Sequence, residues 1–281
     1  LAFGTAGTGG FSILNSGCAS YSPYIQYLIA IFMILFGVNF NVYYFILIKK
    51  FKDAIHYEEL KYYLLFIGAS VAMITYNIHS LFPTIEQAFR HALFQVGTVI
   101  TTTGYASTDF NKWPEFSKFI LVMLMFSGAC AGSTGGGMKV SRLVIMLKTV
   151  KKELLSYLHP RTVRKVKFNG RIVEHEVIRG INVYMIAYAF VLMFSVLIIS
   201  IDNFDFTSNF TAVVALNNIG PGLNIVGPTG NFSMYSNLSK IVMIFDMLAG
   251  RLELFPMLLL INPYTWKEIK IRKNKKEGHS I

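Results

Sequence analysis

The chain has 281 residues, of which 53% are hydrophobic and only 15% are charged, and its mean hydropathy is +0.49. Soluble globular proteins carry about 25% charged residues, so this composition excludes an ordinary water-soluble fold and predicts an all-α protein that crosses a membrane several times. The two cysteines, Cys18 and Cys130, lie far apart in unlike surroundings, which favours packing roles over a disulfide or a ligand set. The chain opens without Met, inside an expected loop over residues 1–22, so we expect a fragment of a longer protein.

The net charge of +11 is distributed unevenly along the chain. Most Lys and Arg residues lie in three blocks, 49–61, 139–179 and 267–276, whereas the intervening loops carry acidic residues and few basic ones. This pattern follows the positive-inside rule, so we expect the basic blocks on the cytoplasmic side. We therefore assign the charge to membrane topology and not to nucleic-acid binding.

Apolar runs long enough to span a membrane occur at residues 24–48, 62–82, 181–201 and 236–261. At about 1.5 Å per residue, a helix of about 20 residues crosses a hydrocarbon layer of about 30 Å. A further span begins at 116–126 but is interrupted by the glycine-rich residues 127–137, and we expect helix to resume at Met138. Broken helices at membrane depth are tolerated where they are buried in protein or line a water-filled cavity.

Two shorter segments have a different character. Residues 84–100 form an amphipathic stretch too short and too polar to cross a membrane, and Thr-Thr-Thr-Gly-Tyr-Ala follows at 101–106. We expect a re-entrant helix feeding an extended loop, whose carbonyl oxygens could replace the hydration shell of a monovalent cation. Residues 206–216 precede Asn-Asn-Ile-Gly-Pro-Gly at 217–222 in the same way.

The order of a spanning helix, a re-entrant helix, a Gly-centred loop and a second spanning helix repeats along the chain. We align the loops on Gly9, Gly104 and Gly220. The resulting domains are 1–61, the second half of one repeat; 62–179, a repeat with a broken inner helix; and 180–281, a repeat with a basic tail. Three loops leave a ring around an ion unclosed, so we expect a further unit and the front of the first one to be absent from this chain.

Three other features have competing interpretations. Residues 132–139 faintly resemble a phosphate-binding loop, but Met138 occupies the position of the required Lys, and we reject a nucleotide site. The basic connection at 148–179, with a hairpin expected at 166–173, is either a solvated loop or a docking surface for a cytosolic partner. Charges in the last span mark a functional site by default, although Asp246 and Glu253 could simply be salt partners of Arg251.

Four ordered motifs resemble those of the Trk/Ktr/HKT superfamily of potassium transporters, and most closely its bacterial TrkH/TrkG branch. They are Thr-Thr-Thr-Gly-Tyr-Ala at 101–106, Ala-Gly-Ser-Thr-Gly-Gly-Gly-Met-Lys at 131–139, Asn-Asn-Ile-Gly-Pro-Gly at 217–222 and Gly-Arg-Leu-Glu at 250–253. The resemblance covers essentially the whole chain. It implies four pseudo-symmetric repeats around one pore, of which this chain would hold the second half of repeat two and all of repeats three and four.

The resemblance also implies roles for individual residues. Backbone carbonyls of the filter loops would coordinate the transported K⁺, and the residues concerned are Gly7, Thr8, Gly9, Thr102, Thr103, Gly104, Asn218, Ile219 and Gly220. An intramembrane loop would block the pore as a gate, and its residues are Gly132, Ser133, Thr134, Gly135, Gly136 and Gly137. Arg251 would lie beside that loop as an electrostatic barrier to cations.

The implied function is potassium uptake across the bacterial cytoplasmic (inner) membrane, with no organic cofactor. The implied partners are a second copy of the chain in a homodimer, a cytosolic nucleotide-binding regulatory subunit resembling TrkA, and membrane lipid, without nucleic acid. A Ktr-type Na⁺-dependent transporter or a poorly selective Na⁺/K⁺ transporter is the alternative. A membrane-embedded enzyme or scaffold is remote, because the six histidines are scattered and form no convergent catalytic set.

Overall fold

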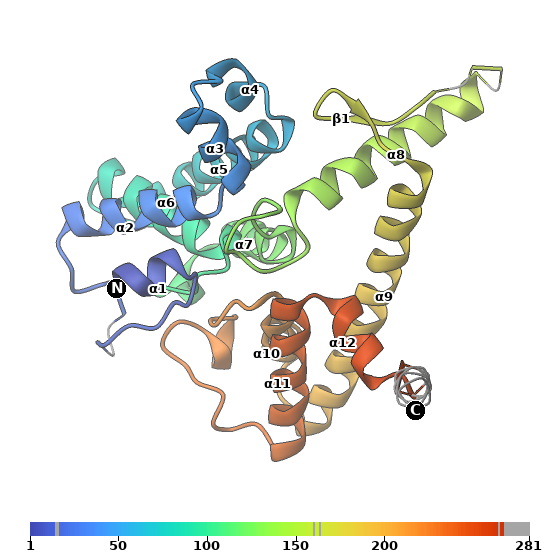
Figure 1. The fold of residues 1–281 in the computed structure, drawn as a ribbon. Coiled ribbons are helices and arrows are strands. Elements are labelled where there is room, and N and C mark those ends of the chain that lie inside the picture. Colours follow the sequence, from blue (N-terminus) through green and yellow to red (C-terminus); the bar gives the residue numbers. More distant parts are fainter. Residues whose placement is uncertain (15–16, 160, 163, 264, 267–281) are drawn as a thin grey trace, which may run out of the picture.

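The computed structural model describes residues 1–14, 17–159, 161–162, 164–263 and 265–266. The described chain is mostly helical, and its strands form one short two-stranded antiparallel sheet. The helices form two groups, one built from the N-terminal half and one from the C-terminal half (Figure 1). The all-α class predicted from composition is therefore confirmed. The basic block at 267–276 lies outside the described residues.

Two helices in the described part of the chain are long and apolar enough to cross a membrane. They are α5 (Glu58–Ile78), which continues into the 3-10 helix η1 (His79–Leu81), and α9 (His175–Ile199), which continues into η3 (Ser200–Asp202). Most of the α9 surface is apolar and exposed, as Phe190 at 70% exposure illustrates. Such a surface is unfavourable in water and suits contact with lipid.

The unit that begins with α5 continues in the predicted order. The helix α6 (Ile85–Ile100) begins at Thr84, whose hydroxyl accepts a hydrogen bond from the Gln87 amide at 3.2 Å. It packs against α2 (Pro23–Phe36), α5 and α7 (Glu115–Ser127), so its last turns are buried. This helix is too short to span a membrane, as predicted, and it ends at the Thr-Gly loop. The 3-10 helix η2 (Phe110–Lys112) leads from that loop towards α7.

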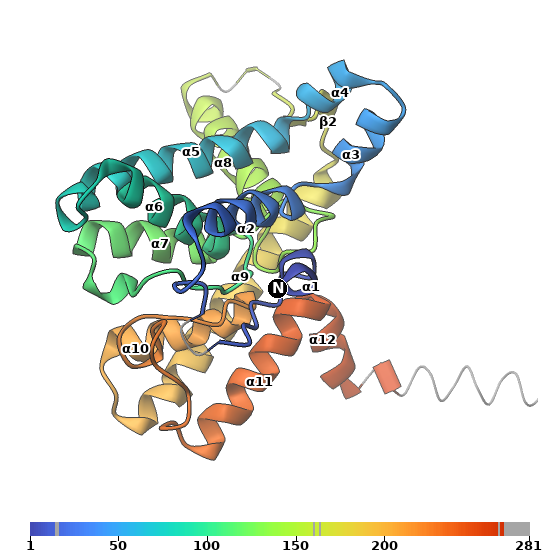
Figure 2. The same ribbon diagram turned by 90° about the vertical axis from the view of Figure 1, so that its left-hand side faces the viewer.

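The C-terminal unit has the same order of elements. After α9, the short α10 (Phe206–Ala212) and η4 (Val213–Asn217) lead into the third Gly loop, which η5 (Asn224–Val226) follows. The helix α11 (Asn237–Leu252) then packs along η4 and α9 (Figure 2). The two complete units thus share one order of elements.

Two spans predicted as continuous helices are broken. The run 24–48 forms α2 and α3 (Phe40–Leu47), which meet at an angle of 90°. Its bend follows from Asn39, whose side chain accepts a hydrogen bond from the Asn41 amide and so starts a new helix. The run 236–261 forms α11 and α12 (Leu254–Ile261), separated by Glu253 at φ 69°. Interrupted inner spans are thus common to all three units.

The start of the chain also differs from the expected loop. Residues 1–22 include α1 (Ala2–Ala6), which directly precedes the first Gly loop. This short helix therefore occupies the same position relative to its loop as the ends of α6 and η4. The remaining short helix, α4 (Phe51–Ile55), lies in the expected cytoplasmic connection before α5.

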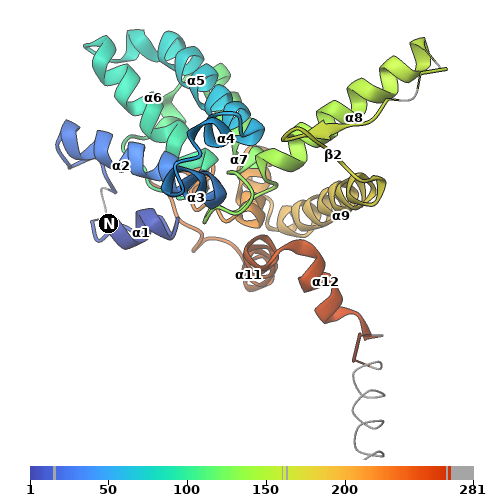
Figure 3. The ribbon, with the colours of Figure 1, turned by 45° about the horizontal axis from the view of Figure 1, so that its top comes forward.

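The basic connection contains the predicted hairpin. Its strands are β1 (Lys167–Phe168) and β2 (Arg171–Ile172), and Asn169 and Gly170 turn between them with positive φ angles of 50° and 74°. The preceding helix α8 (Val140–Leu158) resumes two residues later than expected, and its C-terminal end projects away from the other helices (Figure 3). The Lys148 ammonium group ties the hairpin to α5 through Glu58 and the Lys167 carbonyl.

Candidate functional site

The three Gly loops share one backbone conformation. Thr8, Thr102 and Asn218 have positive φ angles of 51°, 57° and 59°, which few residues other than Gly adopt. The amide of each donates a hydrogen bond to the carbonyl three residues earlier, at 3.3, 3.1 and 2.9 Å. In each unit, therefore, a short helix ends in the same tight turn and releases the chain into a loop.

This shared conformation corrects the alignment of the first loop by one residue. Since Thr8 matches Thr102 and Asn218, Gly10 and not Gly9 matches Gly104 and Gly220. A second hydrogen bond agrees, because the Gly9 amide donates to Gly4 in the way that the Thr103 amide donates to Thr98, five residues back. The sequence alignment was wrong here because Gly9 and Gly10 are adjacent, and either of them could be aligned with Gly104 and Gly220.

The loops meet one another closely. A Cβ atom added to Gly10 would lie 1.9 Å from the carbonyl oxygen of Thr103, and one added to Gly104 would lie 3.3 Å from the Gly220 amide. Gly10 and Gly104 also have positive φ angles of 68° and 91°. Glycine is required at these positions both for its φ range and for the close approach of two backbones.

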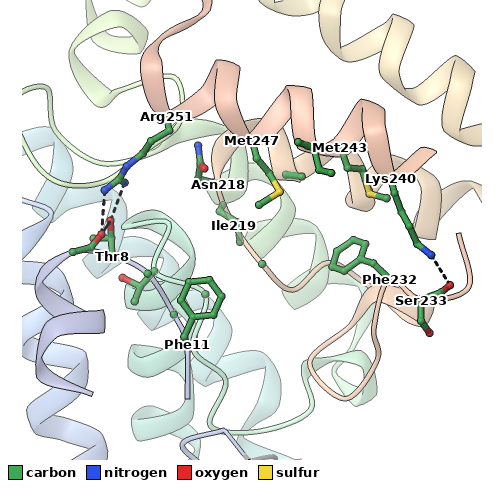
Figure 4. Close-up of a pocket in the computed structure, with 18 residues that line it drawn as sticks. Thr8, Phe11, Asn218, Ile219, Phe232, Ser233, Lys240, Met243, Met247 and Arg251 are labelled. Carbon is green, nitrogen blue, oxygen red and sulfur yellow. Dashed lines mark hydrogen bonds between the residues drawn. The ribbon is translucent and has the colours of Figure 1, made fainter. Parts of the chain in front are cut away.

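A cavity of about 660 Å³ lies against the loops and α11 (Figure 4). All of the predicted filter residues except Thr102 line it, together with Gly10 and Phe11. On the α11 side it is lined by Lys240, Met243, Met247 and Arg251, with Arg251 pointing towards Thr8 (Figure 4). The structure thus brings together loops whose matching residues, Thr8, Thr102 and Asn218, are 94 and 116 positions apart in sequence.

The predicted gate segment, residues 132–137, lies directly against the turns in which the short helices pass into the Gly loops. The amide of Gly136 donates a hydrogen bond to the Thr102 hydroxyl at 2.7 Å, and the Thr8 hydroxyl donates one to the Thr134 carbonyl at 2.9 Å. A Cβ atom on Gly136 would come within 2.7 Å of the Asn217 carbonyl oxygen. One glycine-rich segment therefore contacts all three loop units.

Two cationic side chains hold this segment. The Arg251 guanidinium donates to the Thr134 carbonyl at 2.9 Å, to the Gly7 carbonyl at 3.3 Å and to the Thr8 hydroxyl at 3.4 Å. The Lys139 ammonium group donates to the Gly135 carbonyl. Both positive charges lie beside a second cavity of about 380 Å³ lined by residues 132–137.

Asp246 and Glu253 are not the salt partners of Arg251, contrary to one interpretation of the sequence. The Ser195 hydroxyl donates to Asp246 at 2.9 Å, whereas Glu253 pairs with Arg142 at 2.8 Å. The Arg142 guanidinium also lies over the ring of Tyr184, 4.1 Å from its centroid. Because Asp246 and Glu253 bond to other residues, the guanidinium of Arg251 bonds instead to the first Gly loop and the gate segment.

Sequence reasoning missed two residues that the structure brings into the site. Lys139 lies at the end of the glycine-rich motif at 131–139, and a charge in a broken intramembrane helix is a signal in itself. Asn217 lies fully buried behind its loop, where its side chain accepts from the Tyr188 hydroxyl at 3.0 Å and donates to the Met125 carbonyl at 2.8 Å. Its position directly before Asn218 was the available signal.

The fold and the site define a membrane protein built from repeated units, in each of which a short helix delivers a turn and loop to a shared cavity. A family model described as TrkH, a cation transport protein, matches residues 60–266. The chain belongs to the TrkH family of cation transport proteins.

Individual relatives agree with this assignment. The Trk system potassium uptake protein TrkH of Salmonella typhimurium is 33% identical over 273 residues, covering 95% of this chain and 56% of the relative. TrkG of Escherichia coli K12 is 29% identical over 267 residues, covering 94% of this chain and 55% of the relative. The crystal structure of the potassium transporter TrkH from Vibrio parahaemolyticus superimposes with a TM-score of 0.86 at 31% identity, covering 94% of this chain and 58% of that chain. The chain thus spans just over half the length of these relatives.

Proposed function

We propose that this chain forms part of a potassium uptake pathway across the bacterial cytoplasmic membrane. The observation that carries the proposal is the convergence of three loops with one backbone conformation on a cavity beside Arg251. The relatives' names, potassium uptake protein and potassium transporter, supply the ion. K⁺ is the transported cargo and requires no organic cofactor.

The backbone carbonyls of the loops coordinate K⁺ in this proposal. The set is Thr8, Gly9 and Gly10, with Thr102, Thr103 and Gly104, and Asn218, Ile219 and Gly220. Gly10 is added to the residues expected from sequence because it occupies the place of Gly104. The carbonyl of Gly7 already accepts from the Arg251 guanidinium, so we assign Gly7 to the junction with the gate.

Residues 132–137 act as the gate below these loops, and Arg251 holds the gate closed. Its guanidinium bridges the filter side, at Thr8, and the gate side, at Thr134. A positive charge in a narrow passage of low dielectric also repels a passing cation. Opening therefore requires that the bridge break and that the segment leave the pore axis.

The same reasoning extends to organisation and partners. The units 1–61, 62–179 and 180–281 are repeats or parts of repeats around the pathway. The chain works as a homodimer in lipid, and a cytosolic nucleotide-binding subunit of the TrkA type docks on the basic connection 148–179. The relatives' description as parts of a Trk system supports a regulatory partner.

A second candidate is a transporter that distinguishes Na⁺ from K⁺ poorly or depends on Na⁺. It is favoured by one observation, the replacement of two threonines by Asn218 and Ile219 in one loop. When the loops around an ion differ in sequence, the number and field strength of the ligands that they supply also differ.

Uptake of ⁸⁶Rb⁺ by proteoliposomes holding the complete protein tests both candidates. We expect saturable uptake that excess K⁺ suppresses and an equal concentration of Na⁺ does not. Equal suppression by Na⁺ would establish the poorly selective alternative, and a requirement for external Na⁺ would establish the Na⁺-dependent one. Absence of any protein-dependent uptake would refute the function itself.

A further inference from the structure

Glu59 lies outside the loops and the gate, yet its carboxyl group contacts the chain on both sides of the gate segment. The residue belongs to the first turn of α5 and is 1% exposed. Its Oε1 atom accepts hydrogen bonds from the Ala131 amide at 2.7 Å and from the Ser141 amide at 3.1 Å. One oxygen atom therefore joins the residue directly before the gate segment to the first turn of α8, which follows that segment.

The second carboxyl oxygen is fixed by Asn39. The Asn39 amide nitrogen donates to Glu59 Oε2 at 3.3 Å and to the Tyr57 hydroxyl at 3.1 Å. The orientation of this amide group is set independently, because Asn39 Oδ1 accepts the Asn41 amide at 2.9 Å as the cap of α3. Asn39 can therefore present only its nitrogen to Glu59.

The carboxyl group also supplies a cap that α8 lacks. The residue at the cap position of α8, Lys139, makes no side-chain capping bond, and its ammonium group reaches into the gate segment. The Ser141 amide is one of the orphan donors in the first turn of that helix, and Glu59 satisfies it from α5. The start of α8 is thus anchored by a residue eighty-two positions away.

Backbone contacts complete the anchorage and leave the middle of the segment outside it. The Val140 amide donates to the Ala129 carbonyl at 3.0 Å, and the Phe40 amide donates to the Gly132 carbonyl at 3.1 Å. Between these anchors, Thr134 and Gly136 bond to the filter loops. The fixed ends therefore determine where the central residues lie.

We propose that Glu59 is a positioning residue that holds the two ends of the gate segment together and so sets its closed position. The inference rests on the proposed role of residues 132–137 as a gate. It predicts that loosening the clamp raises the resting ion flux, since a segment with free ends spends less time under the loops.

The first test is Glu59→Gln in the complete protein, with ⁸⁶Rb⁺ flux as the readout. Glutamine keeps an oxygen for the Ala131 and Ser141 amides but places its own nitrogen against the Asn39 nitrogen, which cannot turn away. Loss of one such buried hydrogen bond shifts a two-state equilibrium on the order of tenfold, and we expect a resting flux about tenfold higher. Glu58→Gln is the matched control, because Glu58 bonds to Lys148 and Asn169 and not to the segment.

The decisive variant is the reciprocal exchange Asn39→Asp with Glu59→Gln. Aspartate at 39 still caps α3 and now accepts from the glutamine nitrogen, while the glutamine oxygen still accepts from Ala131 and Ser141. The Tyr57 hydroxyl can rotate to donate to the aspartate. We expect the double variant to restore the low resting flux, which a general loss of stability would not predict.

The outcomes separate this inference from the proposed function. Absence of Rb⁺ flux through the wild-type protein would refute the proposed function. If the wild-type protein conducts Rb⁺ and folded Glu59→Gln has the same resting flux, the clamp proposal is overturned. Should the variants fail to fold, amide exchange in the wild-type protein decides. The Ala131 and Ser141 amides should exchange more slowly than the Gly136 amide, and faster exchange would overturn the proposal.

Discussion

The guanidinium of Arg251 and the hydroxyl of Thr8 lie 3.4 Å apart, although 243 positions separate them in the chain. The same guanidinium donates to the Thr134 carbonyl at 2.9 Å, which also accepts from the Thr8 hydroxyl. The first Gly loop, residues 132–137 and α11 therefore meet in one small hydrogen-bonded cluster. Changes at any of its three members should be felt by the other two.

Arg251→Ala should raise the resting ⁸⁶Rb⁺ flux, on the order of tenfold, because it removes the bridge between Thr8 and Thr134 together with a positive charge beside the pathway. Arg251→Lys retains a positive charge but cannot hold three acceptors in the same geometry, so its resting flux should lie between those of the wild type and Arg251→Ala. Flux equal to wild type in Arg251→Ala would contradict the gate role.

Gly10→Ala tests the corrected loop register. The added methyl group would approach the Thr103 carbonyl to 1.9 Å at a φ of +68°, so we expect loss of nearly all flux. Gly9→Ala should be milder, since its Cβ would make only ordinary contacts with Phe11, from 3.5 Å. Gly180→Ala on α9, where nothing lies within 4 Å, is the control with unchanged flux. A greater loss in Gly9→Ala than in Gly10→Ala would restore the original alignment.

Asp205 caps α10 and should make the C-terminal loop unit sensitive to acid. Burial disfavours its charged carboxylate, but hydrogen bonds from Ser208 and Asn224 outweigh this effect and lower its pKa below the ordinary value of 3.8. Its contribution to stability is therefore fully present above pH 3.8 and is lost as the pH falls through the lowered pKa.

Thermal unfolding in detergent at pH 7 and pH 3 measures this contribution. Asp205→Ala should lower the unfolding free energy at pH 7 by about 1 kcal/mol, the usual value of an N-cap. Asparagine also caps helices well, so the unfolding free energy of Asp205→Asn should be close to that of the wild type at pH 7. Between pH 7 and pH 3 this variant should lose less unfolding free energy than the wild type. An identical acid response in wild type and Asp205→Asn would exclude Asp205 as a source of the effect.

The basic connection should bind the regulatory subunit. Lys151→Glu with Lys152→Glu reverses two charges on the projecting helix α8, and we expect affinity for the cytosolic subunit to fall at least tenfold, by roughly 1.4 kcal/mol or more. Resting flux should not change, since neither residue lines the cavities beside the loops or the gate segment. Lys112→Glu, which reverses one charge in the loop expected on the opposite side, is the control for each single reversal, Lys151→Glu or Lys152→Glu, and equal weakening there would argue against a specific docking surface.

Much of the architecture was predictable because it depends on local and periodic properties. Low charge and long apolar runs indicated membrane helices, and Asn169-Gly170 indicated the hairpin that the structure contains. The length and polarity of residues 84–100 were enough to identify α6 as a short helix ending at a loop. The family motifs were contiguous and so could be recognised before any folding information was available.

The broken spans and the loop register were decided by tertiary structure. An apolar run such as 24–48 satisfies every sequence criterion for one helix, and its bend depends on the Asn39 cap and on Gly37, whose Cβ would lie 2.2 Å from the Tyr63 hydroxyl. Likewise, a choice between Gly9 and Gly10 needed the φ angle at Thr8. Composition and periodicity report what each segment prefers by itself. The hydrogen-bond partners of Arg251 and Glu59 lie far away in the sequence. They are therefore determined only when the folded chain brings distant segments together.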